Sequence, residues 1–102
     1  MTALAVFTTV CSKREARQLA NAMVEARLAA CAQISKVDSV YAWKGKIERG
    51  KEYRVLFKTT AARYEQIEHA IRSVHSYELP AIYAVAIAHI SAPYAGWIES
   101  NS

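Results

Sequence analysis

The stretch from about Ala30 to Trp43 most constrains the fold, because its side chains follow the pattern of one very long β-strand. Large residues at Val37, Tyr41 and Trp43 recur with a period of two, which is typical of a strand and not of a helix. Strands in globular proteins usually run for about 5–6 residues. Even with a break near Asp38 the stretch is too long for a small sheet, so we expect its surplus edge to pair with another copy of the chain.

A charged turn with two glycines, Gly45 and Gly50, follows this stretch. Beyond the turn Tyr53, Val55 and Phe57 alternate with more polar neighbours, which predicts another strand. The two strands and the turn between them therefore predict a long β-hairpin.

The N-terminal segment predicts a strand followed by an amphipathic helix. Residues 4–10 are apolar or β-branched, and Ser12 with Glu15 forms the S-x-x-E capping box that marks a helix start. Apolar residues then recur at helical spacing and predict the buried face. They are Ala16, Leu19, Ala20 and Met23.

The C-terminal half predicts a second helix and a last strand. Thr60 can cap this helix, which we expect to end near His75. Its predicted buried positions are Tyr64, Ile67, Ile71 and Val74. Pro80 favours an extended backbone before it, residues 81–90 have the composition of a buried strand, and Pro93 is suited to begin one short terminal helical turn.

The predicted order β-α-β-β-α-β places the chain in the α+β class. With right-handed crossovers this order gives a four-stranded antiparallel sheet with two helices on one face, the ferredoxin-like plait. The length of 102 residues fits a single domain spanning residues 1–102. Because this fold hosts many unrelated activities, function has to be inferred from particular residues.

Charge and hydropathy argue against nucleic-acid and membrane partners. The net charge of +4 is spread among acidic residues instead of forming a basic patch. The RNA-recognition module shares the element order, but Lys51 stands where its motif requires an aromatic residue. No apolar run approaches the roughly 20 residues of a membrane span, and the start does not look like a secretory signal. We therefore expect a cytoplasmic protein.

No combination of residues predicts catalysis. A nucleophile held by a base, or an acid placed opposite a base, is not evident, and Ser12 is better explained as a helix cap. The turn after the first strand has no glycine-rich cradle for phosphate. We therefore expect that the protein is not an enzyme.

Aromatic and polar side chains from strand ends and from the loop before the last strand are predicted to meet in a cleft. They are Tyr41, Trp43, Lys58, Tyr77 and Glu78. Such residues are also common in subunit interfaces, so packing and ligand binding both remain open. Lys58 favours a carboxylate or phosphate ligand over a metal ion.

A copper or other divalent-cation site is a further hypothesis. Imidazole and thiolate groups suit copper and zinc, which makes His75, with Cys11 or Cys31 of the same or a neighbouring subunit, a candidate ligand set. The two cysteines lack the paired spacing of a zinc or redox motif. A histidine at a helix end can equally well cap backbone carbonyls.

Several segments, taken together and in this order, resemble the CutA family of divalent-cation tolerance proteins. They are Thr8-Thr9, Leu28–Cys31, Ser39–Gly45, Glu52, Lys58-Thr59, His75–Pro80 and Tyr94–Ile98. The resemblance covers nearly the whole chain.

The resemblance implies a homotrimer, similar in architecture to PII signalling proteins, in which the long hairpin interleaves with its neighbours. It also implies tolerance of divalent metals and copper binding in some members. The family's copper ligands fall on Thr8, Val74 and His75 here, and only His75 has a ligand-type side chain. Gln33 and Ser76 stand where the family often has asparagine and proline. We expect a metal-responsive trimer, or alternatively a PII-like trimer that binds a small molecule or protein in an intersubunit cleft.

Overall fold

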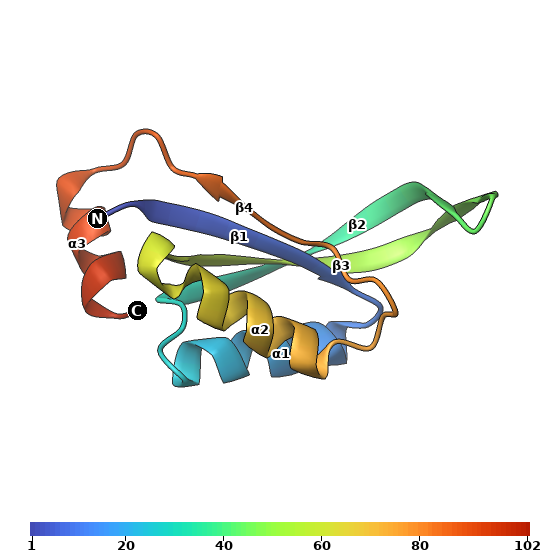
Figure 1. Ribbon diagram of the computed structural model, residues 1–102, viewed down its shortest axis with the longest axis horizontal. Coiled ribbons are helices and arrows are strands. Elements are labelled where there is room, and N and C mark those ends of the chain that lie inside the picture. The colour runs from blue at the N-terminus through green and yellow to red at the C-terminus, as the bar shows by residue number, and fades with distance from the viewer.

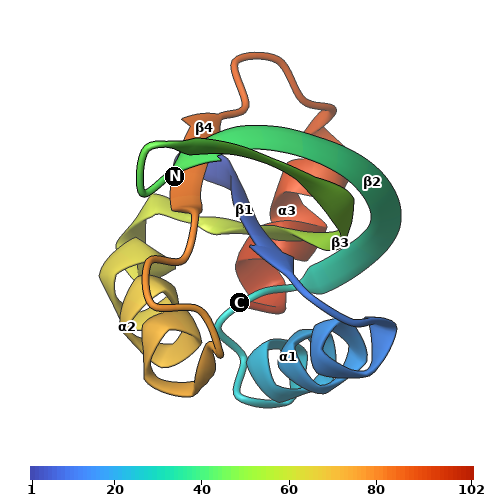
Figure 2. The same cartoon turned by 90° about the vertical axis from the view of Figure 1, so that its right-hand side faces the viewer.

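The computed structural model describes residues 1–102 and confirms the predicted α+β class and order of elements. The elements are β1 (Ala3–Val10), α1 (Lys13–Glu25), β2 (Cys31–Trp43), β3 (Lys46–Thr60), a 3-10 turn (Ala61–Arg63), α2 (Tyr64–Val74), β4 (Ile82–Ala86) and α3 (Ala92–Ser100). The strands form one antiparallel sheet in the order β2-β3-β1-β4. Both α1 and α2 lie on one face of this sheet (Figures 1 and 2).

The predicted long hairpin is confirmed and projects beyond the rest of the sheet, but its turn is only Lys44 and Gly45, and Gly50, expected in the turn, lies within β3 opposite Ser39. β2 pairs with β3 without a break, from Cys31 opposite Lys58 to Trp43 opposite Lys46. β1 covers only the second half of β3, ending where Val10 lies opposite Tyr53. Residues 37–52, which we call the arm, therefore form a two-stranded ribbon that gives the molecule its 44 Å length (Figure 1). The backbone N–H and C=O groups without partners lie along the outer edges of the arm and not between its strands.

The core lies between the sheet and the two helices. Its residues come from β1 and β3, from the inward faces of α1 and α2, and from the connection between α1 and β2. They are Val6, Val10, Ala16, Leu19, Met23, Ala29, Val55, Phe57, Ile67 and Ile71. Val74, the last predicted member of the α2 face, is instead 63% exposed at the end of the helix.

β4 is shorter than the predicted strand over residues 81–90 and ends at Ala86. Its only partner is β1, and the pairing stops at Ala86 opposite Leu4, close to the beginning of β1. The apolar residues Ile87 and Ile90 pack instead against Ile98 of α3 at the end of the molecule far from the arm. The predicted strand was too long because the sequence pattern cannot show where a partner strand begins.

The start of α2 and the length of α3 also differ from expectation. The Thr60 hydroxyl makes no capping bond, and a three-residue 3-10 turn precedes α2. The Ala61 N–H donates a hydrogen bond to the carbonyl oxygen of Thr2 instead. α3 has nine residues instead of one turn, and the hydroxyl of its cap, Ser91, accepts a hydrogen bond from the Tyr94 N–H.

Replacing Thr8 by valine is expected to stabilise the fold by about 1 kcal/mol, because a buried hydroxyl without a hydrogen bond costs free energy that a methyl group does not. Thr8 is 1% exposed, and its hydroxyl has no partner. Thr59→Val is the matched control, because the equally buried Thr59 hydroxyl donates to the Leu28 carbonyl at 2.7 Å. We expect Thr59→Val to lose about 1 kcal/mol in the same urea unfolding experiment. Equal losses in both variants would contradict this account of Thr8.

Candidate functional site

Three segments meet where the arm leaves the rest of the sheet (Figure 1). They are the base of the arm, the start of α1 and the loop after α2. His75, the residue that ends α2, has hydrogen bonds at both ring nitrogens. Nδ1 lies 3.1 Å from the Tyr77 N–H and accepts from it, so Nε2 carries the proton and donates to the Thr9 carbonyl at 2.8 Å. The imidazole can therefore bind a metal only by giving up one of these bonds.

Glu15 in the first turn of α1 holds the residue after His75. Its carboxylate accepts from the Ser76 N–H at 3.1 Å, from the Ser76 hydroxyl at 3.0 Å and from the Cys11 thiol at 3.4 Å. Burial pushes the pKa of Glu15 upward, but these hydrogen bonds and the nearby His75 outweigh it, so the pKa lies below its ordinary value. A proline at position 76 would lack both donors, so this anchor depends on serine.

The three predicted metal ligands do not converge within one chain. Cys11 lies near His75 through their shared neighbour Glu15. Cys31 lies at the other end of the long hairpin strand, with its sulfur 3.9 Å from the Tyr94 hydroxyl. No group of three or more histidine, cysteine, aspartate and glutamate side chains is arranged to hold a metal ion. A site that combines Cys31 with His75 of the same chain is therefore not formed.

The positions that correspond to the copper ligands implied by resemblance also fit copper poorly. Thr8 is buried beneath the helices, and Val74 offers no donor atom. His75 is the only imidazole near the base of the arm and is already hydrogen-bonded. The ligand types that suit copper in this region are therefore one imidazole, of His75, and one thiol, of Cys11, with the Glu15 carboxylate between them.

Four of the five predicted cleft residues lie on the arm or on the loop at its base. The Tyr77 hydroxyl donates to Glu52 Oε2 at 2.7 Å, and Glu78 forms an ion pair with Lys44 at 3.4 Å. The pKa of Tyr77 is raised, chiefly by burial and then by the hydrogen bond and negative charge of Glu52. Tyr41 adds a smaller contribution in the same direction. Tyr41 and Trp43 belong to the arm itself.

Lys58, the fifth residue, is not part of this group. It lies on β3 opposite Cys31, and its ammonium group is 5.3 Å from the centre of the Tyr94 ring. Lys58 is six residues along β3 from Glu52, and at about 3.3 Å per residue the two are roughly 20 Å apart. The predicted cleft with Lys58 beside Tyr77 is therefore not formed within one chain.

Glu52 and Glu15 are the functional residues that sequence reasoning missed. Glu52 was named among the residues that carry the family resemblance, and Glu15 only as part of a capping box. The capping role of Ser12 is confirmed, since its hydroxyl accepts from the Glu15 N–H at 3.1 Å. The side chain of Glu15, however, turns to Ser76, and no local pattern signals a bond between residues so distant in sequence.

A shallow depression of about 250 Å³ lies beside this group, between α1 and the end of α2. Its lining residues are Glu15, Gln18, Leu19, Ala22, Val74 and His75. Small-molecule sites usually enclose about 300–1,000 Å³. The depression therefore suits an ion or a small group better than a large organic ligand.

Glu15→Gln is expected to destabilise the protein more at pH 7 than in acid. Folding lowers the pKa of this carboxyl from its ordinary value of 4.5. Its stabilising contribution is therefore present above pH 4.5 and is lost as the pH falls through the lower pKa of the folded state. Urea unfolding of both proteins at pH 7 and in acid measures the difference. Glu25→Gln, on the last turn of the same helix, is the control, since it removes a carboxylate of the same helix away from Ser76.

Comparison with known proteins agrees with this architecture. Residues 4–101 match the family described as CutA1 divalent ion tolerance protein. The Divalent-cation tolerance protein CutA of Thermus thermophilus is 36% identical over 98 residues, which cover 95% of each chain. Protein CutA of Mus musculus is 37% identical over 96 residues, which cover 93% of this chain and 54% of that protein. The chain thus spans about half the length of the mouse and human relatives it matches.

The solved structures show the same fold. CutA from Synechococcus elongatus PCC7942 is 37% identical and superposes with a TM-score of 0.94, covering 98% of this chain and 89% of that one. None of the helices has both the length and the apolar character required to span a membrane. The match over nearly all residues and the shared fold lead to one conclusion: the chain belongs to the CutA1 family of divalent ion tolerance proteins.

Proposed function

We propose that the chain acts as a cytoplasmic homotrimer in tolerance of divalent cations and that it does so by binding and not by catalysis. The arm is the observation that carries this proposal. Residues 37–52 extend beyond the sheet with backbone donors and acceptors unpaired along both outer edges. An exposed ribbon of this length tends to pair with another chain.

Exposed apolar side chains support assembly through the arm and the open face of the sheet. On the arm, Val40 is 67% and Ile47 is 59% exposed. On the sheet face opposite the helices, Tyr83 stacks on Phe7 and is 50% exposed. An arm that reaches from one copy onto a different surface of the next makes a heterologous contact, which closes into a ring. A ring of three is the assembly that the family resemblance implies.

Weak binding of copper or a similar divalent ion would use Cys11 and His75, which lie near the base of the arm. Thiolate and imidazole are suitable donors for such ions. Binding would be weak because His75 must release a hydrogen bond to Thr9 or Tyr77 first. The two thiols are free, which fits a reducing compartment such as the cytoplasm.

Calorimetric titration with Cu²⁺ tests the metal part of the proposal. We expect weak binding by the wild type, loss of that binding in His75→Ala and unchanged binding in the control His69→Ala, since His69 is exposed on α2. Equal binding by the wild type and His75→Ala would remove His75 from the site. Absence of binding in all three proteins would contradict metal binding by this chain.

A second candidate function is anion binding between subunits. The Lys58 ammonium group lies over Tyr94, and Tyr94 stacks on Trp97 at 5.7 Å, which gives a cation beside an exposed aromatic surface. A neighbouring subunit could bring its own arm to this group. A rise in melting temperature with citrate or phosphate, absent with divalent metals and lost in Lys58→Gln, would favour this candidate.

A further inference from the structure

We infer that the loop of residues 75–80 is a brace that fixes the direction of the arm, and that Tyr77 is its principal positioning residue. The brace joins the start of α1 and the end of β1 to the arm, through Tyr77 at the base of the arm and Glu78 at its turn. The inference deepens the proposed function, because it rests on the arm being the element that assembles the trimer.

The arm needs such a brace because little else fixes it to the body. Beyond Val10 opposite Tyr53, β1 no longer covers β3, and the two remaining strands continue alone. An isolated two-stranded ribbon is marginally stable and twists readily. Apart from the continuity of its own strands, the arm is linked to the rest of the chain by one side-chain hydrogen bond and one ion pair, Tyr77–Glu52 and Glu78–Lys44. Both links come from this one loop.

The other side of the loop is held to the body. The Ser76 N–H and hydroxyl both donate to Glu15 of α1, and the His75 ring bonds to the Thr9 carbonyl of β1. The Tyr77 N–H donates to the His75 ring, so the backbone next to the Tyr77 side chain is also fixed. A force on the arm is thus transmitted through Tyr77 to two elements of the body.

Tyr77 carries more of this link than Glu78. The Glu78–Lys44 pair has both side chains about 70% exposed, and exposed ion pairs contribute little. The Tyr77 hydroxyl bond to Glu52 is short at 2.7 Å, partly buried and made to a carboxylate, which makes it one of the stronger kinds of hydrogen bond. Glu52 is the first residue of β3 beyond the cover of β1, so the bond acts at the pivot of the arm, where it leaves the sheet.

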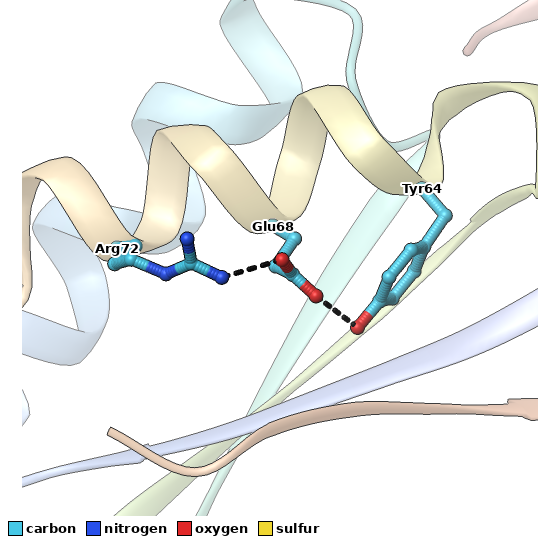
Figure 3. Close-up of polar contacts among 3 residues, drawn as sticks. All are labelled: Tyr64, Glu68 and Arg72. Atoms are coloured by element: carbon cyan, nitrogen blue, oxygen red, sulfur yellow. Dashed lines mark hydrogen bonds and ion pairs between the residues drawn. The ribbon is translucent and has the colours of Figure 1, made fainter. Parts of the chain in front are cut away.

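The test compares two tyrosine-to-phenylalanine substitutions that each remove one hydroxyl–carboxylate bond. Tyr77→Phe removes the bond at the pivot. Tyr64→Phe removes the 2.9 Å bond to Glu68 on α2, where Glu68 also pairs with Arg72 (Figure 3). Because the control loses the same kind of bond away from the arm, it separates a general loss of stability from a loss of arm direction.

Two readouts are measured on full-length protein. Sedimentation over a dilution series gives the concentration at which the trimer dissociates. Spin–spin distances between labels at Gln18→Cys on α1 and Glu48→Cys on the arm, with Cys11 and Cys31 replaced by serine, give the spread of arm directions. We expect Tyr77→Phe to raise the dissociation concentration by about tenfold and to broaden the distance distribution. Tyr64→Phe should remain within about twofold of the wild type, with an unchanged distribution.

The two readouts distinguish failure of the inference from failure of the proposed function. A trimeric wild type with Tyr77→Phe unchanged in both readouts would overturn the inference alone. A monomeric wild type would overturn the proposed assembly, while the distance distribution would still test the brace. Glu52→Gln keeps a carbonyl acceptor for the Tyr77 hydroxyl and should retain a narrow distribution, whereas Glu52→Ala should match Tyr77→Phe. Equal broadening in Glu52→Gln and Glu52→Ala would contradict the role given to this hydrogen bond.

Discussion

Replacing residues 38–51 by the two-residue turn Lys-Gly is expected to convert the trimer into a folded monomer. The design keeps Val37 opposite Glu52 as the last pair of the hairpin and retains the Glu52 acceptor for Tyr77. Lys-Gly is the turn the chain already uses, where Lys44 and Gly45 both have the positive φ of a type I′ turn. Because an even number of residue pairs is removed, Val37 and Glu52 beside the new turn point to the same faces of the hairpin as Trp43 and Lys46, which flank the present turn.

The monomer should remain folded because the arm contributes nothing to the core. None of the buried residues belongs to residues 37–52. Circular dichroism should therefore show the native mixture of helix and strand, while sedimentation should give the mass of one chain. Lys44→Asn, which keeps the arm and favours the same turn, is the control and should remain trimeric. A trimer formed by the shortened chain would contradict the role of the arm.

Ile71→Ala is expected to cost about 2–5 kcal/mol of folding free energy, the largest effect of any single substitution considered. Ile71 is fully buried on α2 between the sheet and α1 and belongs to the main core cluster. Truncation there removes apolar burial and leaves a cavity that the neighbouring helices can fill only in part.

The control for this prediction is Val74→Ala, three residues along the same helix. Val74 is 63% exposed, so its truncation should change stability by less than about 0.5 kcal/mol. Urea unfolding should be compared at one protein concentration, because the stability of an oligomer depends on concentration. Similar losses in Ile71→Ala and Val74→Ala would contradict the assignment of the core.

The order of elements could be predicted from the sequence because each element carries its own periodicity and punctuation. Ser12 and Glu15 mark the start of α1, and alternation from Val37 to Trp43 and from Tyr53 to Phe57 marks the strands of the hairpin. One boundary that depends on a partner strand was predicted wrongly. β4 ends at Ala86 because β1 begins at Ala3, whose carbonyl accepts the last bond from the Ile87 N–H, and no local pattern carries that information.

The site was harder to predict because its geometry depends on contacts between distant segments. Tyr77 and Glu78 belong to one loop beside the arm, and Tyr77 lies near the arm residue Tyr41, so part of the predicted group does come together within one chain. Lys58 lies six residues from Glu52 along β3, so within one chain it stands apart from this group, and its place in a cleft between subunits stays a prediction. The link from Ser76 to Glu15 could not be foreseen from spacing, because a carboxylate in a first helical turn is usually explained by the helix itself.

We expect the arm to complete the hydrogen bonding of its outer edges on other copies of the chain. Sedimentation equilibrium of the wild-type protein, from micromolar concentration downward, measures whether it does. We expect a single species with the mass of three 11.3-kDa chains over this range. A folded species with the mass of one chain at every concentration would contradict it.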